Sequence, residues 1–443
     1  MSGVRLSGWG RTNPGVATLR TVSSEEEIAA AIAAAPAVIA RGLGRSYGDP
    51  AQVSGGTVLR SDMDDIGPID DEGVLCVGAG ASLDQLLATS IPQGWFLPVT
   101  PGTRQVTIGG AIAADVHGKN HHVDGSFARH VLNLRIVTPT GVVATSPEED
   151  GELFWSTMGA MGLTGVVASV SLKLLKIETD QVIVDTQRFS NLDDVMNEMT
   201  RSDERYRYSV AWVDCMTRGA NMGRAVLTRG DHAPASDVDT PSLRAPSPAR
   251  LKVPFDAPSG LLNPLSIRAF NEAWFRRSPK HRVAKLEPLA SFFHPLDGVG
   301  DWNRLYGRRG FVQYQFCVPE TAGDTVRRAI EHLAASGLAS FLAVLKRFGP
   351  SNPAPLSFPM PGWTLALDLP VGPATLPQVL DDLDELVLSA GGRVYLAKDA
   401  RLSPDKFRAM YPRLDSFREV KNRVDPEHKM TSDLSQRLDL VGA

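Results

Sequence analysis

The sequence has few cysteines and no long apolar stretch. Its three cysteines, at positions 76, 215 and 317 of 443, lie far apart and include no CxxC pair. Their odd number and wide spacing argue against a disulfide framework and against a cysteine-rich zinc site. No segment approaches the roughly 18 apolar residues of a membrane span, and the amino terminus lacks the apolar core of a secretory signal. We therefore expect no signal peptide and no transmembrane helix, and a location in the cytoplasm or peripherally at a membrane, its periplasmic face included.

An excess of charge of one sign is also absent, as are internal repeats. The 46 basic and 50 acidic residues leave a net charge of −4, which provides no basic surface of the kind that nucleic-acid binding requires. The apolar content of 43% is that of an ordinary globular protein. At roughly 150 residues per domain, the length predicts two or three domains.

The order of predicted elements changes near residue 182. Before it, helical and strand patterns alternate, with Ser24 and Ser82 at predicted helix starts and a hairpin turn at 138–141. After it, strands are crossed by two long predicted helices at 321–335 and 376–390, which is typical of an α+β domain with one face of an antiparallel sheet covered. Residues 231–261 lack periodicity and predict a mobile loop or lid. A last strand is expected at 393–398.

Two glycine-rich segments carry the first chemical signal. Residues 41–49 read RGLGRSYGD, whose GxGxxxG spacing and following proline exclude a Rossmann fingerprint. Closely spaced glycines can still form an anion nest for a pyrophosphate, although an ordinary turn explains this segment alone equally well. In the second segment, residues 101–114, Gly109 and Gly110 would let a flat ring or a diphosphate approach the backbone. Together the two segments predict one long cofactor lying between them.

A cluster of histidines follows the second glycine segment. Four of the nine histidines lie close together in the sequence, at positions 117, 121, 122 and 130. His117 and His121 have the spacing of a metal pair on a helix, but Gly118 and Asn120 disfavour a helix and no HExxH pattern is present. We expect no metal; a role in an active site and a structural hydrogen-bonding role both stay open.

Five segments, in order, resemble the vanillyl-alcohol-oxidase-type FAD enzymes over nearly the whole chain. They are ARGLGRSYGD, PGTRQVTIGGAIAADVHGKNHH, LFWSTMGAMGLTGVV, VYLAKDAR and VDPEHKMTSDLSQRL. The glycine segments are shared widely in that family. The HGKNHH, YQF, FGP and PGW segments resemble more narrowly the branch that oxidises decaprenylphosphoryl ribose in the synthesis of cell-wall arabinan precursors.

The resemblance implies a two-domain α+β fold. The FAD-binding α+β domain would comprise residues 1–181 and 392–443, and a substrate domain with an antiparallel sheet and covering helices would comprise residues 182–391. The FAD would be held non-covalently, because Arg45 stands where relatives with a covalent flavin commonly have a histidine. The residues expected to contact FAD are Arg41, Gly42, Gly44, Arg45, Ser46, Tyr47, Gly48, Gly102, Thr103, Thr107, Gly109, Gly110, Ala113, His117, Val166 and Tyr395.

The resemblance also implies which side chains do the chemistry. Lys398 would face flavin and substrate with His117 and Tyr47 beside it, whereas the residues alone favour a surface lysine at a strand end. Strand alternation at 394–398 would place Lys398 on an apolar face. As a neutral amine it would polarise the substrate hydroxyl, and as an ammonium it would stabilise the reduced flavin; both stay open. The substrate-binding residues expected are Gln313, Gln315, Lys346, Trp212, Thr364, Phe293 and Lys398.

The expected reaction is oxidation of the 2′-hydroxyl of a polyprenylphosphoryl-β-D-ribose to a ketone. The implied partners are the lipid-linked sugar phosphate, an NAD-dependent reductase for the keto sugar, and a membrane surface contacted peripherally. Thr364 and Ala366 stand where the best-known members have asparagine and a cysteine that nitroaromatic inhibitors modify, and Phe293 stands for a usual tyrosine. These changes keep two alternatives open: a soluble FAD-dependent alditol, aldonolactone or nucleoside-sugar oxidase, and a flavin-binding protein without turnover.

Overall fold

Two four-stranded sheets are built from the first part of the chain. The computed structural model describes residues 3–249, 251–258, 260–338, 340 and 342–442. One sheet has the order β1-β2-β4-β3 with parallel pairs around β4, and the other is antiparallel with the order β5-β9-β7-β8. Their strands are β1 (Val4–Leu6), β2 (Gly15–Val22), β3 (Val38–Ala40), β4 (Thr57–Ser61), β5 (Val74–Gly78), β7 (Val131–Thr138), β8 (Gly141–Thr145) and β9 (Val166–Lys173).

The helices of this part begin where the capping residues predict. Ser24 precedes α1 and its Oγ accepts a hydrogen bond from the Glu27 amide at 3.2 Å. Ser82 and Gln85 form a reciprocal capping box at the start of α2. The predicted hairpin is confirmed by antiparallel pairing of β7 and β8. The helices here are α1 (Glu25–Ala34), α2 (Leu83–Ser90), α3 (Ile108–Ala113), α4 (His121–Asp124) and α5 (Gly151–Thr157), and the short strands β6 (Trp95–Phe96) and β10 (Leu175–Lys176) pair with each other.

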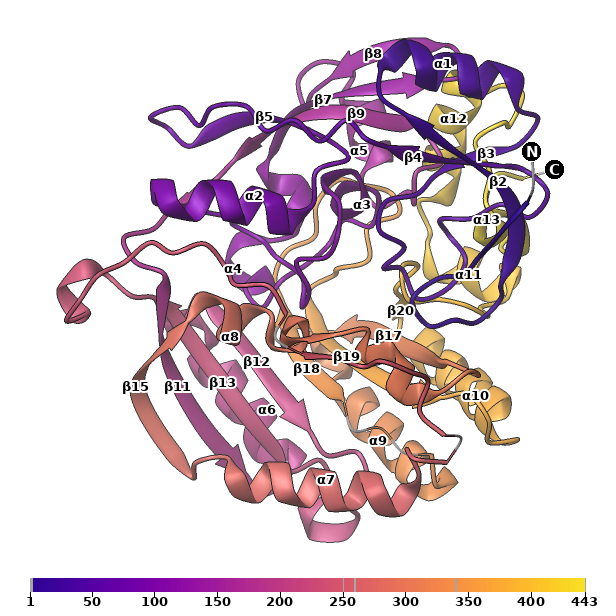
Figure 1. Cartoon of the computed structure of the whole chain (residues 1–443). Helices are drawn as coiled ribbons and strands as arrows, with labels where there is room; N and C mark the ends of the chain where they lie inside the picture. Colours follow the sequence, from indigo (N-terminus) through magenta and orange to yellow (C-terminus); the bar gives the residue numbers. More distant parts are fainter. Residues whose placement is uncertain (1–2, 250, 259, 339, 341, 443) are drawn as a thin grey trace.

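The middle of the chain forms an eight-stranded antiparallel sheet of order β15-β11-β13-β12-β18-β19-β17-β20. Helices α6 (Leu192–Ser202), α9 (Asp324–Ser336) and α10 (Leu376–Ser389) pack on one face (Figure 1). Tyr314 on that face donates to Asp384 of α10 at 3.0 Å. The prediction of an α+β fold with a covered antiparallel sheet is confirmed. The strands are β11 (Gln181–Phe189), β12 (Tyr208–Val213), β13 (Ala225–His232), β15 (His281–Pro288), β17 (Phe311–Pro319), β18 (Ala343–Phe348), β19 (Gly362–Pro370) and β20 (Arg393–Val394).

The end of the chain returns to its beginning, as the indigo and yellow segments of Figure 1 show. The amide of Val38 donates to the carbonyl of Lys429 at 2.8 Å, and the amide of Thr431 donates to the carbonyl of Val38 at 3.0 Å. Arg437 forms an ion pair with Asp49 at 2.8 Å. The remaining helices are α7 (Pro264–Arg277), α8 (Leu289–Phe293), α11 (Pro404–Met410), α12 (Leu414–Val424) and α13 (Asp433–Arg437).

Two predicted segments differ in the structure. The strand expected at 393–398 ends at Val394, where the chain turns and the Lys398 amide donates to the Tyr395 carbonyl at 2.9 Å. Residues 231–261, expected as one loop, begin with the end of β13 and include β14 (Leu251–Lys252), which pairs in parallel with β16 (Val299–Gly300). Residues 250 and 259 of that loop lie outside the described residues. So does Phe341, where the sequence pattern predicts the start of a strand over 341–346. Among the described helices, none has the length and apolar character to cross a membrane.

Candidate active site

Three segments distant in sequence meet at the first glycine loop. A Cβ on Gly42 would collide with the Thr107 side chain of the second glycine loop, and a Cβ on Gly48 would collide with the carbonyl oxygen of Asp399. The Tyr47 amide donates to the Ala397 carbonyl at 2.9 Å. Because Gly42 and Gly48 have no side chains, the two glycine loops and the turn that carries Lys398 can pack directly against one another.

The second glycine loop presents a row of small residues at the start of α3. Thr107 caps this helix, with its Oγ1 accepting from the Gly110 amide at 3.1 Å. Ile108, Ala111 and Ile112 are buried, whereas Gly109, Gly110 and Ala113 stay partly open. Upstream, Gly102 is exposed and Thr103 donates to Asp297 at 2.6 Å. The open row is a surface that a planar or diphosphate group can approach closely.

The face of the large sheet opposite its helices carries a buried polar network. Gln313 and Gln315 alternate on β17 and so share this face. The Gln313 amide donates to the Tyr47 hydroxyl at 3.3 Å and also to Asp368. The Gln315 amide lies 3.0 Å from His117 Nε2 and donates to Thr364 Oγ1 at 3.2 Å. Because Gln313 is only 8% exposed and Gln315 only 3%, this face of the sheet is closed to solvent at both positions.

Lysines border this network and burial lowers their pKa values. The Lys398 ammonium lies 3.9 Å from the centre of the Tyr47 ring. Burial lowers the pKa of Lys398 to about 7, an effect that the Asp368 carboxylate opposes and the Lys346 charge strengthens. Burial likewise lowers the pKa of Lys346 to about 8. The Lys346 ammonium donates to the Gly118 carbonyl at 3.5 Å, so this strand residue reaches the histidine segment.

His117 lies inside the network with an aromatic surround. Its ring centre is 4.8 Å from that of Phe348 and 5.2 Å from that of Tyr395. Burial, with the nearby Lys346 charge, lowers the pKa of His117 well below its ordinary value, so the ring is neutral at physiological pH. Its Nδ1 is buried and has no hydrogen-bond partner among the described residues. Tyr395 stacks on Phe358 at 4.6 Å and donates to the Ala114 carbonyl at 2.7 Å.

The other histidines of the cluster serve separate structural contacts. His121 accepts from the Gly349 amide at 3.2 Å, His122 donates to the Tyr206 carbonyl with an N···O distance of 2.9 Å, and His130 lies 3.1 Å from the Asp124 carbonyl. These partners lie on different elements. In the described part of the chain, no group of three or more potential ligands is gathered for a metal.

The remaining predicted site residues divide into those near the network and those apart from it. Trp212 of β12 pairs with Val344, which pairs with Ala366 of β19, so these residues share one row of the site face. Arg45 stacks on Trp9 at 3.9 Å and its buried Nε lacks a partner among the described atoms. The others have structural contacts: Arg41 donates to the Ser7 carbonyl, Val166 lies in a cluster with Val38 and Met430, and Phe293 packs with Phe96 and Tyr208.

Three residues of the site were not predicted from the sequence. Asp368 is fully buried, its pKa is raised to about 7 by burial, and Tyr306 donates to it at 3.3 Å. Lys119 lies near Lys346, and its pKa is lowered to about 7 by burial. The sequence could have predicted a place for Asp368 in the site, because Thr364, Ala366 and Asp368 alternate along one strand and so share one face. Nothing in the sequence indicated Tyr306, since this residue lies in a short 3-10 helix outside the segments that resemble the family.

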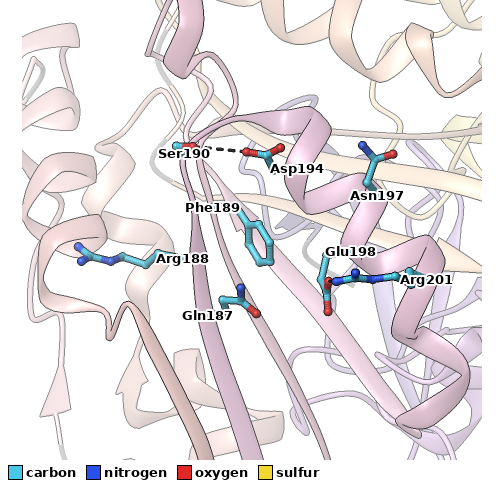
Figure 2. Close-up of a pocket in the computed structure, with 8 residues that line it drawn as sticks. All are labelled: Gln187, Arg188, Phe189, Ser190, Asp194, Asn197, Glu198 and Arg201. Carbon is cyan, nitrogen blue, oxygen red and sulfur yellow. Dashed lines mark hydrogen bonds and ion pairs between the residues drawn. The ribbon is translucent and has the colours of Figure 1, made fainter.

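A surface pocket elsewhere in the molecule contains none of the predicted residues. It has a volume of about 440 Å³ and lies between β11 and α6, on the helix-covered face of the sheet (Figure 2). Its lining includes Asp194, which accepts from Ser190 at 3.4 Å, and Glu198, which pairs with Arg201 and Arg229. The acidic side chains of this pocket are therefore paired within the protein. We place the candidate active site at the buried polar network and not at this pocket.

Comparisons with known proteins identify a FAD-binding domain and a family. A sequence profile described as FAD binding domain matches residues 16–146, and one described as D-arabinono-1,4-lactone oxidase matches residues 374–438. Decaprenylphosphoryl-β-D-ribose oxidase of Mycolicibacterium smegmatis is 43% identical over 99% of this chain and 98% of that protein. An uncharacterised protein of Streptomyces coelicolor is 40% identical over 81% of this chain and 100% of its own length. The rice L-galactono-1,4-lactone dehydrogenase 2 is 29% identical over 33% of this chain and 25% of that protein.

The paired glycine loops and the matched FAD-binding domain define a FAD-dependent oxidoreductase of the vanillyl-alcohol-oxidase type. Because the similarity to the Mycolicibacterium smegmatis enzyme extends along nearly the full length of both proteins, the chain belongs to the family of decaprenylphosphoryl-β-D-ribose oxidases. Its cofactor is FAD. The residues present fit this group: the row at Gly109, Gly110 and Ala113 is open, and buried nitrogens of Arg45 and His117 lack partners among the described atoms.

Proposed function

We propose that this protein oxidises the 2′-hydroxyl of a polyprenylphosphoryl-β-D-ribose to the 2′-keto sugar. The observation that carries the proposal is the position of Lys398, an amine whose pKa burial lowers to about 7, beside Tyr47, Asp368 and the glutamine pair. Such a group can exchange a proton with an alcohol near neutral pH. The similarity to the Mycolicibacterium smegmatis oxidase supports the choice of substrate.

We propose that the FAD-binding domain comprises residues 1–181 and 392–443, with the substrate domain at residues 182–391 between them. Support comes from the Lys398 turn and from Arg437 of α13, which contact residues 47–49 of the first glycine loop, and from residues 429–431, which hydrogen-bond to Val38 of β3. Residues 42–48 and 107–113 would hold the cofactor, with His117 and Tyr395 near its ring. When bound, FAD supplies the two-electron acceptor for the hydrogen that leaves the sugar carbon.

The side chains of this protein accept the proton that leaves the sugar hydroxyl. A neutral Lys398 amine accepts it, and Asp368 stabilises the ammonium that results. Gln313 and Gln315 accept hydrogen bonds from the sugar hydroxyls with their side-chain oxygens, because each amide nitrogen already has two partners within the protein. Lys346, whose pKa of about 8 leaves it mostly protonated at neutral pH, attracts the substrate phosphate. Lys119 is the weaker cation of the two, because burial lowers its pKa to about 7. The neutral ring of His117 fixes Gln315 across the 3.0 Å contact.

An anaerobic titration tests the proposal. The purified protein should show a flavin absorbance spectrum that bleaches on addition of a polyprenylphosphoryl ribose and stays unchanged with the 2′-deoxy analogue. Bleaching by alditols or aldonolactones in place of the lipid-linked sugar would favour the soluble oxidase instead, an outcome to which the profile match at residues 374–438 gives some weight. A flavin that no alcohol reduces would overturn both assignments.

The expected keto-sugar product requires a second enzyme to consume it. A 2′-keto sugar held on a prenyl phosphate can be reduced from the opposite face to give the epimeric alcohol, so we propose an NAD-dependent reductase as the next enzyme. Supplying such a reductase with NADH should convert the product to the arabino epimer and regenerate none of the ribose compound, as chromatography of the lipid-linked sugars would show.

A further inference from the structure

Lys398 is coupled to a buried carboxylate. The charge of Asp368 raises the pKa of Lys398, and the charge of Lys398 opposes the rise that burial causes in the pKa of Asp368. The Gln313 amide donates both to Asp368 and to the Tyr47 hydroxyl. The Tyr47 ring lies 3.9 Å from the Lys398 ammonium, so the four side chains form one group. Asp368 has no exposed surface and therefore cannot exchange a proton with water directly.

Tyr306 contacts Asp368 from outside this group. Its hydroxyl donates to Asp368 at 3.3 Å, and its ring stacks on Phe311 with ring centres 4.0 Å apart. Burial and the Asp368 charge raise the pKa of Tyr306 well above its ordinary value, so the phenol keeps its hydrogen at physiological pH. A neutral hydroxyl is both a donor and an acceptor, so it can take one proton as it gives up another.

Tyr306 also lines a pocket that opens to solvent. This pocket has a volume of about 270 Å³ and lies beside the end of β19 and the start of α7. Arg309 and Gly372 at its rim are exposed. Among its described lining residues, Tyr306 is the one whose side chain hydrogen-bonds to Asp368. The pocket, here named the Tyr306 pocket, includes in its lining Leu262, Tyr306, Arg309, Leu338, Leu369 and Gly372.

The proposed reaction leaves a proton on Lys398 in each turnover. The O–H bond of the sugar breaks and an N–H bond forms on Lys398, while the hydrogen of the sugar carbon leaves with two electrons to FAD. The amine must become neutral again before it can accept another proton. Because sugar and cofactor fill the site during the reaction, the proton needs a route that does not cross the filled cavity.

We propose that Asp368 and Tyr306 carry this proton from Lys398 to solvent in the Tyr306 pocket. An N–H bond of Lys398 breaks and an O–H bond forms on Asp368. The protonated carboxyl then donates to the Tyr306 oxygen, whose own hydrogen passes to water. Lys398 returns to the amine, Asp368 to the carboxylate and Tyr306 to the phenol, so the charges balance. The inference rests on the proposed function, since it gives an exit to the proton that Lys398 accepts.

Paired anaerobic recordings test the inference. FAD-loaded protein in weak buffer is mixed with the polyprenylphosphoryl ribose; one recording follows flavin bleaching, and a pH indicator follows the proton that reaches solvent. In the unmodified protein the two should keep pace. In Tyr306→Phe and in Asp368→Asn the proton should lag at least tenfold behind the bleaching. The double variant should show the lag of Asp368→Asn alone, because effects of residues that share one route are not additive.

A matched control is Tyr314→Phe. Tyr314 is also a buried tyrosine that donates to a buried carboxylate, Asp384 at 3.0 Å, but it lies on the helix-covered face of the sheet. Its proton release should keep pace with bleaching. Imidazole, a small proton carrier, should shorten the lag of Tyr306→Phe at least threefold and leave the unmodified protein unchanged. A merely structural effect of the substitution would slow bleaching itself and would not respond to imidazole.

Proton release that keeps pace with bleaching in Tyr306→Phe would overturn the inference. A lag of the same size in Tyr314→Phe, or a lag that imidazole does not shorten, would also overturn it. These results leave the proposed function standing, because the substrate still bleaches the flavin. If an alditol bleaches the flavin and the lipid-linked sugar does not, the proposed substrate is wrong, and the same recordings with that alditol test the proton route. A flavin that no alcohol reduces would overturn the function and the route together.

Discussion

At the scale of the residue, the site is governed by the burial of lysine side chains, because removing an ammonium from water disfavours its charged form. Lys398, Lys346 and Lys119 lie close to one wall, and removal from water lowers the pKa of each. Asp368 opposes this effect at Lys398, while burial raises the pKa of Asp368 itself to about 7. The pair can therefore exchange a proton near neutrality, which an exposed lysine cannot do.

Replacing Lys398 by methionine keeps the apolar stem and removes the amine. We expect FAD to stay bound and the rate of flavin reduction by substrate to fall by about 10²–10⁴-fold, the usual contribution of a positioned base. Anaerobic stopped-flow absorbance measures this rate. Lys173→Met, at a lysine of β9 that pairs with Glu72 on the surface, is the control and should reduce at the normal rate. A normal rate in Lys398→Met would remove this amine from the mechanism.

Replacing Asp368 by asparagine tests the coupling of the pair. In the unmodified protein the carboxylate raises the pKa of Lys398, so its removal should lower that pKa. Because a neutral amine is the active form, the reduction rate should rise with pH through about 7, and its midpoint should move to lower pH in Asp368→Asn. The pH profile of flavin reduction measures both. A rate that falls as the pH rises would assign the active form to the ammonium. A midpoint that moves to higher pH would contradict the coupling of Lys398 to Asp368.

At the scale of the element, capping residues and strand periods were predictable, but the turn that carries Lys398 was not. Ser24 and Ser82 act locally, each on the first turn of its own helix, so the sequence specifies those ends. The period of two on β17 likewise puts Gln313 and Gln315 on one face of the sheet. Lys398 was expected on a strand face, yet its position is set by a turn packed against the first glycine loop, a contact between segments near opposite ends of the chain.

The close approach of that turn to Gly48 predicts a sensitive position. A Cβ at residue 48 would collide with a backbone oxygen, which has no rotamer with which to yield. We expect Gly48→Ala to lower the free energy of unfolding by about 1–3 kcal/mol and to weaken FAD retention. Thermal unfolding and gel filtration with flavin detection measure the two effects. Gly298→Ala, where a Cβ would meet no atom within 4 Å, should leave both unchanged.

At the scale of the whole molecule, the chain closes on itself around the proposed cofactor site. The first glycine loop, the large central sheet and the turn after β20 all contribute to one junction, through Tyr47, Gln313 and Lys398. The bound cofactor would therefore contact segments from both ends of the chain, and its loss should loosen all of them. FAD in excess over its dissociation constant should raise the unfolding temperature for the same reason.

The attachment of FAD is predicted to be non-covalent. Arg45, in the first glycine loop, stacks on Trp9 and offers no nucleophile for attachment to the flavin. Acid precipitation should therefore release the yellow colour into the supernatant, where absorbance at the flavin maximum measures it. Colour that stays in the precipitated protein after washing would contradict this prediction.

The sequence by itself determined the α+β class, the capped helices, the two glycine loops and the FAD family, because each depends on local patterns or on motifs read in order. Only the tertiary structure decided which side chains share the site. It added Asp368, Tyr306 and Lys119, and it placed Phe293 in an aromatic cluster with Phe96 and Tyr208. The physical reason is that burial and charge coupling depend on neighbours brought together by folding, and those neighbours come from strands and turns that lie far apart in the chain.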